Sequence, residues 1–246
     1  ILLDVKTGSG AFMKSIDDSI ALAKEMVVIG ENAGRKSVAL ITDMDIPLGH
    51  NIGNSLEVIE AVETLKGNGP EDLTEVCVHL ASNMLFLAGK GTLEECRSLV
   101  REVIANGEAL KRLAAMVEAQ GGDSSVIFDT DKFEKAAYQH EVLAKKSGYI
   151  TFMDTESCGI ASAMLGAGRE TKDSQIDFAA GIILKKKVGD YVEAGEPMAV
   201  FYADKEELFA AAELRYQAAV TIEDEKANET PLVYARVTKD QVERLA

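Results

Sequence analysis

The first forty residues combine two patterns of hydrophobic and polar positions. Residues 1–6 form an apolar run that ends in charge, which is typical of a buried strand at its polar carboxyl end. After a glycine turn, apolar residues recur at helical spacing, at Ile16, Ile20, Ala23 and Val27. Residues 37–42 form a second apolar run. Strand, helix and strand in this order predict a βαβ unit of a parallel sheet.

Residues 54–122 carry the start signals of several helices. One helix begins at Asn54 or Ser55, and a second begins at residues 70–72, where acidic groups favour the positive end of a helix. Residues 92–95 (Thr-Leu-Glu-Glu) form a capping box, which predicts a third.

From about residue 124 the pattern changes to short strands separated by glycine turns. We therefore predict an α/β fold class with a division along the chain. Residues 1–122 form an α/β domain with a mixed sheet and flanking helices, and residues 123–136 form a linker. Residues 137–246 form a β-rich subdomain of the barrel-sandwich type.

The composition limits the partners of the chain. Its 246 residues carry a net charge of −15, which argues against nucleic acid as a partner, because phosphate binding depends on Lys and Arg. The three cysteines are far apart, so neither a disulfide framework nor a zinc site is expected, and the cytoplasm fits. No membrane partner is expected, since no apolar run is long enough to cross a bilayer. The chain opens on Ile1, inside a predicted strand, so we expect further residues upstream.

Lys6, Gly8 and Ser9 lie just after the first predicted strand. In open parallel sheets, ligands bind at the carboxyl ends of strands, and glycines let backbone amides approach an anion closely. We therefore predict these three residues as substrate-binding. An ordinary strand-to-helix turn with a surface lysine explains the same pattern, because a lone G-x-G is a weak signal.

The loop of residues 43–53 is long for a connection between a strand and a helix, and such loops are often functional. It offers Asp43, Asp45 and several backbone carbonyls, and Glu60 follows shortly after. Oxygen ligands of this kind suit a hard cation such as K⁺, Mg²⁺ or Ca²⁺. From the residues alone, solvated carboxylates in a turn are the simpler interpretation.

Residues 185–196 resemble the turn-rich pattern of biotinyl and lipoyl carrier folds. Carriers present a modified lysine at a hairpin tip, commonly flanked by Met or Asp, and no convincing tip of this kind is found here. The similarity therefore indicates a shared scaffold and not a carrier function.

Several blocks, in order along nearly the whole chain, resemble pyrimidine-nucleoside phosphorylases, which include thymidine phosphorylases. The first block reads Asp-Val-Lys-Thr-Gly-Ser-Gly-Ala-Phe-Met. The matching blocks are residues 4–13, 42–49, 53–61, 67–73, 120–123, 166–169 and 182–198.

The resemblance implies a pentosyltransferase that converts uridine, thymidine or deoxyuridine and phosphate into the free base and pentose 1-phosphate. It also implies a helical domain, which forms a homodimer, and an α/β domain that binds phosphate, of which residues 1–122 are the C-terminal part. The family's phosphate-binding and base-binding residues precede the Asp-Val-Lys block. No catalytic residue is therefore assigned in this chain, no organic cofactor is expected, and this stretch alone is expected to be inactive.

The resemblance further implies a structural K⁺ ion that supports the phosphate loop. Its ligands map here onto the backbone carbonyls of Leu48 and Asn51 and onto the side chain of Glu60. Other ligands come from upstream, so this chain is expected to hold half of the site. Asn51 is not the commonest residue at its position, but a carbonyl ligand tolerates this change.

Three alternatives stay open. A phosphoribosyltransferase, such as the anthranilate enzyme, shares the fold of the large domain but does not carry the β-rich half. A non-catalytic carrier-like module would hold biotin or lipoate on a lysine. A structural fragment would have no activity by itself.

Overall fold

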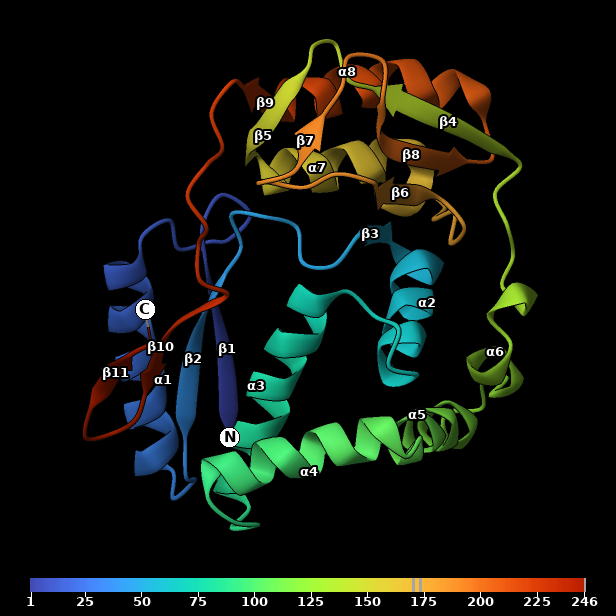
Figure 1. The fold of residues 1–246 in the computed structure, drawn as a ribbon. Coiled ribbons are helices and arrows are strands. Elements are labelled where there is room, and N and C mark those ends of the chain that lie inside the picture. Colours follow the sequence, from blue (N-terminus) through green and yellow to red (C-terminus); the bar gives the residue numbers. More distant parts are fainter. Residues whose placement is uncertain (170, 173, 246) are drawn as a thin grey trace.

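A four-stranded sheet forms the first part of the computed structural model, which describes residues 1–169, 171–172 and 174–245 (Figure 1). Its strands, in spatial order, are β1 (Leu2–Thr7), β2 (Val38–Asp43), β10 (Val233–Val237) and β11 (Val242–Arg244). β1 and β2 are parallel, and β10 is antiparallel to both β2 and β11. The sheet is therefore mixed, as predicted.

Helix α1 (Ile16–Asn32) connects β1 to β2 and confirms the predicted βαβ unit. The Ser15 side chain accepts a hydrogen bond of 3.2 Å from the amide of Asp18, which satisfies one free amide of the first turn. The apolar face of α1 joins one face of the sheet in a buried cluster: Val5, Ile20, Ala23, Val27, Ala39, Ile41, Ala235 and Val237.

A block of helices lies on the other side of β1 and below the second part of the protein (Figure 1). Its members are α2 (Asn54–Leu65), α3 (Glu71–Leu87), α4 (Leu93–Ala105), α5 (Glu108–Ala119) and α6 (Ser125–Phe128), followed by the 3₁₀ turn η1 (Thr130–Lys132). Thr92 and Glu95 bond each other's backbone amides at the start of α4, so the predicted capping box is confirmed. Of these helices, α3 packs against β1 and β2.

Two further sheets and two main helices form the second part, at the top of Figure 1. One sheet has the order β3 (Asn51–Gly53), β6 (Gly181–Leu184), β8 (Pro197–Ala203), β4 (Tyr138–Leu143). The other has the order β7 (Tyr191–Val192), β5 (Gly148–Met153), β9 (Val220–Glu223). The helical segments are α7 (Thr155–Ser162), η2 (Ala163–Ala167), η3 (Glu206–Leu208) and α8 (Phe209–Ala219). This part is β-rich, as predicted.

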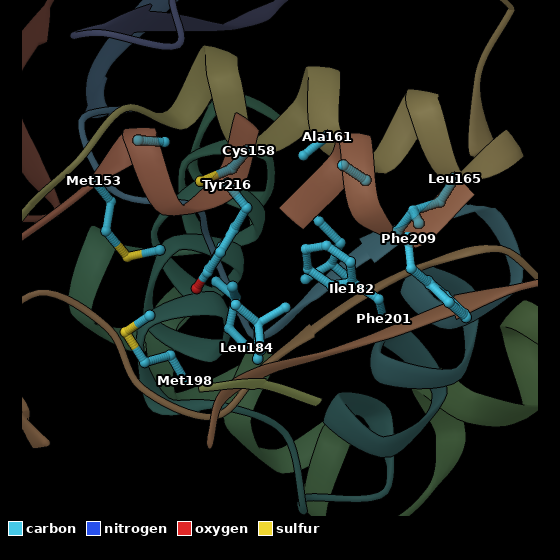
Figure 2. Close-up of a cluster of buried hydrophobic side chains, with 14 of the residues drawn as sticks. Met153, Cys158, Ala161, Leu165, Ile182, Leu184, Met198, Phe201, Phe209 and Tyr216 are labelled. Atoms are coloured by element: carbon cyan, nitrogen blue, oxygen red, sulfur yellow. The ribbon is translucent and has the colours of Figure 1, made fainter. Parts of the chain in front are cut away.

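Buried aromatic and aliphatic side chains hold the second part together (Figure 2). Phe201 and Tyr216 are fully buried and meet edge to face, with ring centroids 5.6 Å apart. Leu165, Ile182 and Leu184 line the same cluster. Burial of each such side chain contributes about 1.5–3 kcal/mol, so this core is large enough to stabilise the β-rich part.

The sheets do not follow the division expected from the sequence. β3 belongs to the chain before residue 122, yet it pairs with β6 of the second part. β10 and β11 belong to residues 137–246, yet they complete the first sheet. At the first crossing the backbones approach closely: a Cβ atom on Gly181 would lie 2.4 Å from the carbonyl oxygen of Ile52. The two parts are therefore interlocked.

Across the residues that the structure describes, every helix is too short or too polar to pass through a membrane.

Candidate substrate and cation sites

The carboxyl ends of β1 and β2 face the β-rich part of the protein (Figure 1). The loops that follow these strands, residues 8–13 and 43–50, meet the start of α7 at this point, where a Cβ atom on Gly10 would lie 2.6 Å from the Thr155 side chain. Of the predicted site residues, Lys6 lies in β1, and Gly8 and Ser9 follow it. The predicted cation ligands come later in the chain: Leu48 in the loop after β2, Asn51 in β3 and Glu60 in α2.

Lys6 lies on the face of β1 opposite to the α1 cluster. Its ammonium is 2.7 Å from Asp4 Oδ2, and the other Asp4 oxygen accepts a hydrogen bond of 2.5 Å from the Thr42 hydroxyl. The Lys6 side chain is 32% exposed. Because an ammonium has three donors and Asp4 accepts one, Lys6 keeps donors for an anionic ligand. Its predicted role in substrate binding stays a prediction with compatible geometry.

The amides of the glycine loop, in contrast, are already paired. Gly8 N donates to Met13 O at 3.1 Å, Ser9 N donates to Asp45 Oδ1 at 2.7 Å, and Gly10 N donates to Met44 O at 3.0 Å. These bonds leave no free amide at Gly8 or Ser9 for an anion. A substrate contact by Ser9 would have to use its hydroxyl, which accepts a bond of 3.3 Å from the Thr155 amide.

Gly8 is required by close packing. Its φ of +127° is in a region that favours glycine, and a Cβ atom there would lie 2.6 Å from the Asp45 nitrogen. Asp45 thus caps the glycine loop and is not a simple solvated turn residue.

Asp43 accepts a hydrogen bond of 2.9 Å from the Tyr234 hydroxyl, and burial is the main cause that raises its pKa. Asp45 therefore connects the loop after β2 to the glycine loop, and Asp43 connects the end of β2 to Tyr234.

Glu60 lies in α2 and places a buried carboxylate against the loop predicted to hold a cation. It is 8% exposed, and it accepts hydrogen bonds from the amides of His50 at 2.8 Å and Asn51 at 3.3 Å. Burial raises its pKa above the usual range, while these two amides lower it. Within the part of the chain that the structure describes, no Lys or Arg lies within 4.0 Å of its oxygens. A buried carboxylate in such surroundings favours a cation nearby.

The donors at this loop fit a hard cation better than a transition metal. Among the described residues, no group of three or more His, Cys, Asp and Glu side chains could hold a metal ion. The residues predicted as ligands, which are the Glu60 carboxylate and the carbonyls of Leu48 and Asn51, offer oxygen atoms, the ligand type that suits K⁺. That these three residues form half of a cation site stays a prediction.

Two charged residues near this loop escaped the sequence analysis. Asp72 accepts a hydrogen bond of 3.2 Å from the Gly49 amide, and Lys187 donates one of 2.9 Å to the Gly49 carbonyl. Both residues line a cavity of about 540 Å³ between the two parts of the protein, together with His50 and Leu232. Lys187 is the third of three consecutive lysines, so no pattern in the sequence distinguished it.

Comparison with known proteins identifies the two parts separately. Residues 1–110 match the family model described as the glycosyl transferase family, a/b domain. Residues 149–223 match the model described as the pyrimidine nucleoside phosphorylase C-terminal domain. The chain belongs to the pyrimidine-nucleoside phosphorylase family.

Pyrimidine-nucleoside phosphorylases from two bacteria are similar to this chain over most of its length. The protein of Bacillus subtilis (strain 168) is 52% identical over 207 residues, which are 84% of this chain and 48% of the relative. The protein of Staphylococcus aureus (strain USA300) is 47% identical over 240 residues, which are 97% of this chain and 55% of the relative. The chain thus spans about half the length of the curated relatives it matches.

Proposed function

We propose that this chain serves the phosphorolysis of pyrimidine nucleosides, as part of a longer enzyme. The observation that carries the proposal is the match of both parts, in order, to pyrimidine-nucleoside phosphorylases with 47–52% sequence identity. In this reaction a nucleoside and phosphate give the free base and pentose 1-phosphate. The bond from the sugar to the base breaks while a phosphate oxygen bonds to the same carbon. Uridine, thymidine and deoxyuridine are candidate substrates.

We propose that this chain contributes to the reaction through Lys6, which would bind an anionic group of the substrates. The transition state places positive charge on the sugar between the departing base and phosphate, so catalysis depends on positioning and charge. Phosphate and the departing base are both anionic in character. Lys6, with unused donors at the carboxyl end of β1, is suited to hold one of them.

We propose that this stretch alone has no phosphorylase activity. No catalytic residue is assigned to it, and relatives carry about as much chain again. The test is a phosphorolysis assay with uridine and thymidine, on this chain alone and on a protein of the relatives' length. Release of base by this chain alone would contradict the proposal, whereas release of base only by the longer protein supports it.

We propose K⁺ as the cation at Leu48, Asn51 and Glu60, where it would have a structural role and hold the loop before α2. Support comes from the burial of the Glu60 carboxylate and from its hydrogen bonds to the amides of His50 and Asn51, which hold it beside the loop that carries the two carbonyls. The test compares the melting temperature in potassium, sodium and choline chloride at equal ionic strength. A rise that is specific to potassium and absent from Glu60→Gln supports the site, and equal melting temperatures contradict it.

The remaining expectations concern the intact enzyme. We propose that it is a homodimer in the cytoplasm, with phosphate and a nucleoside as its small-molecule partners. The support is the family resemblance and the three free cysteines, Cys77, Cys96 and Cys158. Sedimentation of the intact protein tests the dimer.

A further inference from the structure

The backbone of Gly49 is held on both sides by charged side chains. Asp72 Oδ2 accepts from its amide at 3.2 Å, and Lys187 Nζ donates to its carbonyl at 2.9 Å. Asp72 and Lys187 also form an ion pair with each other. On a third side, a Cβ atom on Gly49 would lie 2.3 Å from Glu60 Oε2. We call Glu60, Asp72 and Lys187 the Gly49 clamp.

Each member of the Gly49 clamp comes from a different element. Glu60 lies in α2, Asp72 lies in the first turn of α3, and Lys187 lies in the turn between β6 and β7. Lys187 therefore reaches from the β-rich part into the first part. Its side chain is 12% exposed, so water competes weakly for its bonds.

Lys186 makes a different set of contacts, although it is the neighbour of Lys187. Its ammonium bonds to Glu196 at 2.8 Å and to the Tyr191 carbonyl at 3.0 Å, both within the β-rich part. Its side chain is 25% exposed. Lys186 is therefore a matched control: it has the same side chain in the same turn, with no contact to the Gly49 clamp among the described residues.

Gly49 lies between two candidate cation ligands in the sequence. Leu48 precedes Gly49, and Asn51 follows two residues later. The amides of His50 and Asn51 bond to Glu60, and the His50 carbonyl accepts from Leu184 at 2.8 Å. The Gly49 carbonyl is thus the point at which a side chain of the β-rich part controls the direction of this backbone.

We propose that Lys187 is a positioning residue for the backbone of residues 48–51, so that docking of the β-rich part sets the geometry of the cation site. The first half of this inference stands on the contacts of Gly49 alone. The second half rests on the proposed cation function. Loss of Lys187 would leave the Gly49 carbonyl and the Asp72 carboxylate without their charged partner, which is the costly way to break such a pair.

Hydrogen exchange of the segment 46–53, followed by mass spectrometry, tests the positioning role. We expect Lys187→Met to speed exchange of this segment about tenfold or more, because a hydrogen bond to a charged group is lost. Lys186→Met should leave it unchanged, and Lys187→Arg should restore protection, because Arg can reach both partners. Unchanged exchange in Lys187→Met would overturn the proposal. If Lys187→Met does not fold, Asp72→Asn removes the same pair and is expected to give the same faster exchange.

The melting temperature in potassium and choline chloride tests the link to the cation. A potassium-specific rise in the wild type that shrinks in Lys187→Met, and not in Lys186→Met, supports the link. An equal rise in Lys187→Met and the wild type overturns it. If potassium gives the wild type no rise while Lys187→Met still exchanges faster, the cation site is wrong and the positioning role of Lys187 stands.

Discussion

The hydroxyl of Tyr234 donates a hydrogen bond of 2.9 Å to Asp43, which lies 191 residues earlier in the chain. Tyr234 lies in β10 and Asp43 ends β2, so the bond fastens the returning strand to the loop that carries the candidate cation ligands. We expect Tyr234→Phe to lower the free energy of unfolding by about 1–3 kcal/mol, because a half-buried carboxylate loses one of its donors. Urea unfolding measures this.

The control for Tyr234→Phe is Tyr191→Phe. Tyr191 is 48% exposed, and no side-chain hydrogen bond of its hydroxyl is found among the described residues. Its replacement should change stability by less than about 0.5 kcal/mol. Equal effects of the two variants would mean that the bond to Asp43 contributes nothing specific.

Asp43 also predicts a dependence of stability on pH. Burial, as the main cause, raises its pKa above 3.8, so the folded protein holds this proton more tightly than the unfolded chain. Its contribution to stability is therefore present at low pH and is lost as pH rises from 3.8 through the raised pKa. Asp43→Asn does not titrate. The unfolding free energy of Asp43→Asn relative to the wild type should thus rise with pH across this window, and a constant difference would contradict the assignment.

Alanine substitutions at two glycines with positive φ distinguish the effect of backbone strain from the effect of steric crowding. At Gly8 a Cβ atom would lie 2.6 Å from the Asp45 nitrogen, whereas at Gly34 nothing lies within 4 Å. Gly8→Ala should destabilise by about 2–5 kcal/mol through strain and overpacking, and Gly34→Ala by about 1–2 kcal/mol through strain alone. Thermal unfolding compares them. Similar losses would show that the glycine loop and Asp45 can separate at little cost.

Lys6 is the residue of this chain that we expect to matter most for activity. In a complete enzyme that carries this chain, Lys6→Met should lower kcat/KM about 10- to 100-fold, the effect of one lost bond between a charged group and an anion. Lys24→Met, on the exposed side of α1, should leave kcat/KM unchanged. An unchanged kcat/KM in Lys6→Met would show that Lys6 does not bind the substrates.

Local patterns in the sequence predicted the elements whose signals lie within a few residues. Ser15 with Asp18 and Thr92 with Glu95 cap helices through bonds three residues apart, so the sequence contains the whole interaction. β3 has three residues and was not predicted, because such a strand exists only through its partner β6, about 130 residues later.

The candidate sites show the same limit. Glu60 was visible in the sequence, but only the family resemblance favoured it as a cation ligand, and this role stays a prediction. The pairing of the Gly8 and Ser9 amides with Met13 and Asp45 could not be predicted from a G-x-G pattern, since a bound anion and an oxygen acceptor of the protein itself satisfy such amides equally well. Lys187 and Asp72 are 115 residues apart, so only the folded chain brings them together.

The return of β10 to the first sheet also bears on how the protein folds during synthesis. β10 fills the place beside β2, but it is made about 190 residues later. During synthesis, β2 therefore has one unpaired edge while the helices and the β-rich part emerge from the ribosome. An unpaired strand edge is prone to non-native pairing and aggregation. We expect the β-rich core to form before β10 joins the first sheet. Completion of the part that is synthesised first is then the last and slowest event of folding.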